Sequence, residues 1–184
     1  MAMPYLIVVT GKPGSGKTTF AKKLGECFCM PVVSRDRIKE GYVHTKGMGH
    51  SDLPDDANSV VSNIFFETIT NLINSEVSLI AEAAFQHRVW APRLEPLKDR
   101  ARIYMLICKT DEATAFNRYI ERGLNDALRE YFHGDAEVAL ARRGVNVEPR
   151  QYVEPHIGAP LFYIDTTAEY SPSLLELRKA ILDF

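Results

Sequence analysis

The stretch Val8–Leu24, VVTGKPGSGKTTFAKKL, places three β-forming residues directly before a glycine-rich turn, and a helix-forming run begins at Lys17. Glycine adopts left-handed backbone conformations at little cost, so its three occurrences in this turn allow the chain to reverse direction tightly. The stretch therefore predicts a strand, a turn and a helix in immediate succession.

Short apolar runs recur along the rest of the chain, and segments of helical spacing lie between them. Near-continuous hydrophobic strands of this length are typical of a parallel sheet that is covered on both faces. The alternation predicts an α/β fold with right-handed crossovers between parallel strands. The expected strands are Tyr5–Thr10, Met30–Ser34, Val77–Ala81, Arg102–Cys108 and Leu161–Asp165.

Capping residues and apolar spacing indicate where the helices begin and end. The expected helices are Lys17–Cys27, Arg37–Gly41, Asp56–Ile73, Asp111–Arg122 with Gly123 as its stop, and a last helix capped by Ser171 with Pro172 in its first turn. Two polar regions, Gly41–Asp56 and about 124–159, lack a clear pattern. We interpret both as mobile covers over a site, and the second as a lid.

Length and composition limit the class of protein. With 184 residues, of which 46% are hydrophobic, we expect one domain spanning 1–184. A net charge of -2 leaves no basic excess, so any nucleic-acid contact would be local. Three cysteines and no long apolar run favour a reduced, cytoplasmic protein that does not contact membranes. A monomer and a small homo-oligomer are both compatible with the sequence.

The glycine-rich turn matches G-x-x-x-x-G-K-[ST], the Walker A phosphate loop, between a predicted strand and a predicted helix. In such loops, backbone N–H groups converge on phosphate oxygens at the positive end of a helix. We expect Lys17 to neutralise the β- and γ-phosphates and Thr18 to ligate Mg²⁺. The expected nucleotide-binding residues are Gly11, Lys12, Pro13, Gly14, Ser15, Gly16, Lys17, Thr18, Thr19 and Thr167, the last as part of the wall for the base.

Two carboxylates follow predicted strands, at the sheet edge where open α/β folds bind ligands. Asp36 stands where it could accept the proton of an attacking hydroxyl, or cap the short helix that follows it. Glu82 ends an apolar strand beside the phosphate loop and could help Thr18 to organise Mg²⁺, or mark a surface strand end. We expect Asp36 to be the catalytic base and Glu82 a metal-site residue.

Arginines gather in and before the lid region. Phosphoryl transfer spreads negative charge over three oxygens, and a closing lid can deliver guanidinium groups to stabilise it. Arg118 and Arg122 lie four residues apart, on one face of a predicted helix, and are our main catalytic candidates. The other candidates are Arg129, Arg142 and Arg143.

The order of the segments GKPGSGKTT, SRDRIKEG, LIAEAAFQHR, ICKTDEATAFNRYIERG and FYIDTT resembles the small P-loop kinases of the adenylate-kinase-like group, especially the polynucleotide kinase domain, chloramphenicol phosphotransferase and zeta toxin. The resemblance implies a three-layer P-loop fold with strand order 2-3-1-4-5, an arginine-bearing lid, Mg-ATP as donor and a hydroxyl as acceptor. It maps the catalytic aspartate onto Asp36 and the strand-three acid onto Glu82. Where polynucleotide kinase has an arginine three residues after the aspartate, this chain has Lys39, which cannot grip a phosphate bidentately.

The sequence thus predicts an ATP-dependent kinase with a hydroxyl acceptor, either the 5'-hydroxyl of a polynucleotide or a small-molecule alcohol. A P-loop ATPase or nucleotide switch that acts through a protein partner is the alternative, and a non-catalytic nucleotide sensor is a third. GTP remains open as the donor. We expect Gly41–Asp56 and Gln86–Leu97 to shape the acceptor pocket.

Overall fold

In a computed structural model, which describes residues 3–182, that range forms a five-stranded parallel sheet and eight α-helices. The strand order is β2-β3-β1-β4-β5, which confirms the predicted fold class. The strands are β1 (Tyr5–Gly11), β2 (Val32–Ser34), β3 (Leu79–Glu82), β4 (Arg102–Lys109) and β5 (Leu161–Asp165). The helices are α1 (Lys17–Phe28), α2 (Arg35–Lys46), α3 (Ala57–Asn74), α4 (His87–Leu94), α5 (Glu112–Asn125), α6 (Ala127–His133), α7 (Ala136–Arg142) and α8 (Leu174–Ile181), with 3-10 turns η1 (His50–Asp52) and η2 (Glu95–Leu97).

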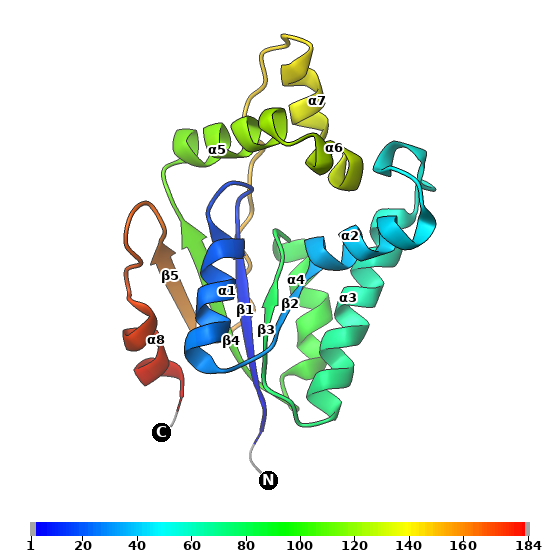
Figure 1. The fold of residues 1–184 in the computed structure, drawn as a ribbon. Coiled ribbons are helices and arrows are strands. Elements are labelled where there is room, and N and C mark those ends of the chain that lie inside the picture. The colour runs from blue at the N-terminus through cyan, green and yellow to red at the C-terminus, as the bar shows by residue number, and fades with distance from the viewer. Residues whose placement is uncertain (1–2, 183–184) are drawn as a thin grey trace.

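The central strand β1 has apolar side chains on both faces of the sheet. Leu6 and Val8 pack with α3 and α4, whereas Ile7 and Val9 pack with α1 and α8, and all four side chains are fully buried. Figure 1 shows these helices covering the two faces, with α5, α6 and α7 lying beyond the carboxyl ends of the strands. Within residues 3–182, every helix is too short or too polar to cross a bilayer.

The register of the sheet aligns the strand ends that carry polar side chains. Glu82 of β3 lies opposite Val9 on one side and opposite Ser34 of β2 on the other. Residues opposite each other in parallel strands project to the same face, here the face that packs against α1. The topology therefore brings Ser34 and Glu82 together beside the start of α1.

Two expected helix boundaries around Asp36 are wrong. Helix α2 begins at Arg35, so Asp36 lies in its first turn rather than at its cap, and the helix continues through Gly41 to Lys46. Val43, which is fully buried, anchors the part of this helix that we expected to be irregular. The helix ends where Gly47 adopts a left-handed conformation, with φ of +65°.

Two further boundaries also differ from the prediction. Helix α5 does begin after Asp111, whose side chain accepts a hydrogen bond from Thr114 N, but Gly123 lies inside it. A Cβ on Gly123 would come within 2.4 Å of the Val138 side chain, so this glycine permits close packing of α7 rather than a helix stop. The last helix is capped by Ser173, not Ser171, because Ser173 and Glu176 form a capping box.

Regular structure also occupies regions expected to be loops. The lid region contains α6 and α7, and the side chain of Asp126 caps α6 by accepting from Leu128 N and Arg129 N. Within Gln86–Leu97, which we expected to shape the acceptor pocket, His87 and Arg88 form the first turn of α4. Helices of only seven or eight residues bury too few apolar positions to leave a clear periodic pattern in the sequence.

Candidate functional site

The phosphate loop connects β1 to α1 through glycines that no other residue could replace without strain. Gly14 and Gly16 have φ values of +80° and +77°, and Gly16 is the N-terminal cap of α1. A Cβ on Gly14 would lie 1.9 Å from the backbone oxygen of Ala115 in α5. The loop thus packs against α5 while the positive end of α1 faces the space above it, as anion binding requires.

Contacts from three other parts of the chain hold this loop in place. Thr166, which is buried, lies with its Oγ1 2.7 Å from the carbonyl of Ser15 and 2.8 Å from that of Lys109. Lys12 forms an ion pair with Glu112 in the first turn of α5. The loop is therefore tied to β4, to the turn after β5 and to α5, which favours a preorganised site.

Oxygen ligands gather beside the loop, at the end of β3. Thr18 Oγ1 donates to Glu82 Oε1 at 3.2 Å, and Ser34 Oγ donates to Glu82 Oε2 at 2.7 Å. The two hydroxyls satisfy a carboxylate that is only 2% exposed and would otherwise be costly to bury. A carboxylate and two hydroxyls next to a phosphate site are the hard oxygen donors that suit Mg²⁺, so this donor set fits the predicted metal.

Asp36 and the phosphate loop line the same cavity, which has a volume of about 260 Å³. Burial raises the pKa of Asp36, but His133 in its protonated form, together with the positive charges of Lys17, Arg35 and Arg129, outweighs burial and holds the pKa below its usual value. Asp36 is therefore a carboxylate at neutral pH and is able to accept a proton. The cavity is lined by Pro13, Lys17, Thr18, Ser34, Asp36, Arg37, Glu40, Ala84, Tyr119, Arg122, Arg129, His133 and Asp135.

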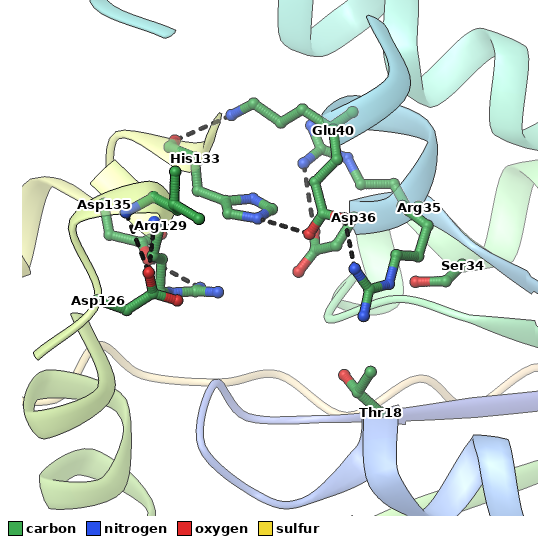
Figure 2. A network of polar contacts seen from close by, with 12 residues as sticks. Thr18, Ser34, Arg35, Asp36, Glu40, Asp126, Arg129, His133 and Asp135 are labelled. Atoms are coloured by element: carbon green, nitrogen blue, oxygen red, sulfur yellow. Dashed lines mark hydrogen bonds and ion pairs between the residues drawn. The ribbon is translucent and has the colours of Figure 1, made fainter. Parts of the chain in front are cut away.

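Helix α6 closes the far side of this cavity through contacts with α2. Figure 2 shows Asp36 and Glu40 of α2 facing His133 and Arg129 across the site. His133 Nε2 lies 3.2 Å from Glu40 Oε1, and Lys39 Nζ donates to the backbone oxygen of His133 at 2.9 Å. Burial lowers the pKa of His133, so its imidazole is neutral at neutral pH and the contact with Glu40 is a hydrogen bond.

The arginines that we named as catalytic candidates lie in different parts of the structure. Arg122 and Arg129 line the cavity that contains Asp36, and Asp135 pairs with Arg129 at 2.8 Å. Arg118 lies on the other side of the loop, where its Nη2 donates to the backbone oxygen of Thr167 at 3.3 Å. Arg142 forms an ion pair with Glu130 instead.

A separate cavity of about 310 Å³ lies between the phosphate loop, α5 and the turn after β5. It brings Thr19 and Arg118 together, with Arg122 shared between this cavity and the one that contains Asp36. Its position is compatible with the nucleoside of a bound nucleotide. The lining residues are Gly14, Gly16, Thr19, Arg118, Arg122, Thr166, Ala168 and Tyr170.

Ser34, His133 and Asp135 are among the polar residues of the site that the sequence analysis missed. Ser34 directly precedes the segment that contains Asp36, so its position at a strand end was an available signal. His133 and Asp135 lie in a polar segment without periodic pattern, about 100 residues from Asp36 along the chain. Only the packing of α6 against α2 brings them into the cavity, and nothing local in the sequence indicates it.

Comparisons with solved structures show which folds the chain shares. A proposed kinase from Chloroflexus aurantiacus J-10-fl superposes with a TM-score of 0.74 at 22% identity, over 98% of this chain and 97% of that one. A sugar kinase from Janibacter sp. HTCC2649 superposes with a TM-score of 0.58 at 17% identity, over 98% of this chain and 95% of that one. The Mycobacterium tuberculosis APS kinase CysC, solved with AMPPNP and APS, superposes with a TM-score of 0.58 at 16% identity, over 100% of this chain and 98% of that one. At these identities the likeness shows a shared fold.

A comparison of the sequence with models of protein families identifies the family of this chain. No curated protein matches the chain. A family described as AAA domain matches residues 6–143, a range that begins in β1 and ends after α7 and so contains the phosphate loop, Asp36, Glu82 and the lid arginines. The resemblance to the adenylate-kinase-like P-loop group is confirmed by this match together with the shared fold, and the chain belongs to this family of P-loop AAA domains.

Proposed function

We propose that the chain is a kinase that transfers the γ-phosphoryl group of ATP to a hydroxyl acceptor. The observation that supports this proposal is the cavity of about 260 Å³ in which a carboxylate, Asp36, shares one space with Lys17 and Thr18. A phosphate loop alone would serve an ATPase or a switch equally well. A negatively charged proton acceptor that faces the loop from α2 is what transfer to an alcohol requires.

The phosphate loop and Lys17 would hold the triphosphate, and Thr18 with Glu82 would hold Mg²⁺. The metal ion would neutralise charge on the β- and γ-phosphates. Ser34 keeps Glu82 in place through their 2.7 Å hydrogen bond. Arg118, Thr19 and Thr167 lie on the side of the loop where the nucleoside would be, so Arg118 has a role in nucleotide binding rather than in transfer.

In the transfer step, Asp36 accepts the proton of the acceptor hydroxyl as its oxygen bonds to the γ-phosphorus. The bond between that phosphorus and the oxygen bridging it to the β-phosphate breaks, and ADP leaves. Arg122 and Arg129 face the same cavity and stabilise the charge that spreads over the transferred group. Most of the rate enhancement then comes from positioning and electrostatics.

The test is transfer of label from γ-labelled ATP to a set of sugars and to a 5'-hydroxyl oligonucleotide, with ADP release measured in the same tubes. We expect Lys17→Ala to abolish both signals. Asp36→Asn should retain nucleotide binding but lose transfer by about 100-fold or more, since general base catalysis contributes about that much. Asp99→Asn, which removes an exposed carboxylate away from the site, is the matched control.

Equal transfer by Asp36→Asn and the wild type would show that Asp36 is not the base. ADP release that no acceptor stimulates, but that a partner protein or ring assembly does, would favour the ATPase or switch instead. Tight ATP binding with no ADP production would indicate a sensor. The first outcome tests the role of Asp36, and each of the other two separates the kinase from one named alternative.

A further inference from the structure

A larger cavity of about 550 Å³, here called the second cavity, adjoins the one that contains Asp36. Both cavities are lined by Arg129 and Asp135, so the ion pair between these residues forms a common wall. The volume is in the range of sites for small molecules. The other polar and aromatic side chains around it are those of His50, Ser51, Asp52, Glu130 and Tyr131.

Close packing between η1 and α6 builds this cavity. Gly134 has a φ of +60°, and a Cβ there would lie 1.7 Å from His50 Cδ2. A Cβ on Gly49 would lie 3.1 Å from the ring of Tyr131. His50 Nδ1 is enclosed by protein atoms and has no hydrogen-bond partner among the described residues. The contacts of Gly134 and Gly49 show that η1 and α6 are fitted closely to each other.

The charge of the second cavity is opposite to what a phosphate needs. The lining carries three carboxylates, those of Asp52, Glu130 and Asp135. Arg142 pairs with Glu130 and Arg129 pairs with Asp135, so Asp52 is the carboxylate without an ion pair among the described residues. The exposed Asp52 would repel a further anion, whereas it would attract an ammonium group, which could lie over the face of Tyr131.

The cations on α2 are already engaged by other groups. Lys39 is 3% exposed and donates to the backbone oxygen of His133. Arg37 pairs with Glu40 at 2.7 Å, and Arg35 Nη2 donates to Asn58 Oδ1 at 2.8 Å. A polynucleotide acceptor would bring phosphates to this side of Asp36, and proteins neutralise such phosphates with lysine and arginine. The three cations that α2 carries beside Asp36 are already bonded within the protein.

We propose that the acceptor is a small amino-bearing alcohol: its reacting hydroxyl lies at Asp36, and its distal, positively charged part occupies the second cavity. This inference rests on the proposed function, because it names the acceptor of that same site. It follows from the position and charge of the second cavity and from the engagement of the α2 cations.

The first test compares three six-carbon sugars that differ in charge, D-glucosamine, D-glucose and D-gluconate, with a 5'-hydroxyl oligonucleotide. Binding is followed through the ring NMR signals of His50, assigned with His50→Asn, in the presence of ADP and Mg²⁺. We expect saturable shifts with glucosamine, about fivefold weaker binding of glucose, and still weaker binding of gluconate. Stronger binding of gluconate or the oligonucleotide, or no saturable shift with glucosamine, would overturn the proposal.

The second test uses two matched variants. Asp52→Asn removes an exposed carboxylate from the lining and should weaken glucosamine binding about fivefold. Asp55→Asn makes the same change three residues away, outside the lining residues, and should leave glucosamine binding at the wild-type level. Equal effects of the two variants would contradict the assignment of the cavity.

Binding and transfer are measured separately, so the two proposals fail in different ways. Glucosamine binding in the expected order, without label transfer to any acceptor, would overturn the kinase function and leave the cavity assignment. Label transfer that favours gluconate or the oligonucleotide would overturn the amino-alcohol inference and leave the kinase.

Discussion

The two sides of the cavity around Asp36 are built in different ways. On the phosphate side, one short segment supplies the binding groups: the loop from Gly11 to Thr18 turns through glycines within it, such as Gly14 and Gly16 at positive φ, although contacts from other segments hold it in place. The side to which we assign the acceptor, here called the acceptor side, is assembled from distant segments, because Asp36 of α2 meets His133 of α6 only through tertiary packing.

This difference shows which part of the chemistry a short segment can encode. Phosphate binding needs backbone N–H groups in a fixed turn, and eight residues suffice to specify that turn. Recognition of an acceptor needs side chains on several elements, held by contacts such as that from Lys39 Nζ to the His133 carbonyl. Substitutions on the two sides should therefore fail for different physical reasons.

The largest effect is expected on the phosphate side, from Gly14→Ala. The new Cβ would lie 1.9 Å from the Ala115 carbonyl oxygen, so either the loop or α5 must shift. A displacement of about 1 Å in such a site costs about 100-fold in function, and the left-handed φ adds about 1–2 kcal/mol of strain. We expect nucleotide affinity, measured by calorimetric titration with a non-hydrolysable ATP analogue, to fall about 100-fold.

Gly144→Ala is the matched control for this change. Gly144 has a similar φ, +76°, but a Cβ there would meet no atom within 4 Å. It should lose stability from backbone strain alone while nucleotide affinity stays at the wild-type value. If both variants bound nucleotide normally, the contact between the loop and α5 would not shape the phosphate site.

An effect on stability rather than on nucleotide affinity is expected from the buried Lys39, on the other side of the cavity. Burial, together with the charge of Arg35, lowers the pKa of Lys39 to about 8 from an ordinary value of 10.5. Between these two pH values the unfolded chain binds more protons than the folded one, so the free energy of unfolding rises with pH across the window. For a difference of this size between the pKa values of Lys39 in the folded and unfolded states, the free energy of unfolding rises by about 3 kcal/mol across the window.

Lys39→Met should remove this rise, because methionine does not titrate. The measurement is chemical denaturation of both proteins at pH values from below 8 to above 10.5, with the difference between them plotted against pH. Lys22→Met, an exposed change on α1, controls for the loss of one lysine. Parallel profiles for the wild type and Lys39→Met would mean that Lys39 has an ordinary pKa.

The contrast between local segments and those brought together by tertiary packing explains how much the sequence could predict. Strong periodic patterns predicted the strands and the long helices, and a motif of fixed spacing predicted the phosphate loop. Asp36 and Glu82 were identifiable because each follows or ends a strand at the sheet edge that binds ligands. His133 and Asp135 were not, because their place in the cavity depends on the packing of α6 against α2. Local turn residues also misled the prediction, since glycine within a helix has the same composition signal as glycine at its end.

The smallest effects are predicted for the stability of variants at two glycines of α2, one inside the helix and one at its end. Gly41 lies inside α2 and a Cβ there would meet nothing within 4 Å, whereas Gly47 ends the helix at a φ of +65°. Gly41→Ala should stabilise the protein by about 0.5–1 kcal/mol, because alanine loses less conformational freedom in a helix. Gly47→Ala should destabilise it by about 1 kcal/mol, because alanine disfavours the left-handed conformation. Thermal denaturation of both variants measures the sign of each change in stability. Destabilisation by Gly41→Ala would indicate that α2 stops at Gly41. The acceptor side would then lack the helical turn that carries Val43 into the core.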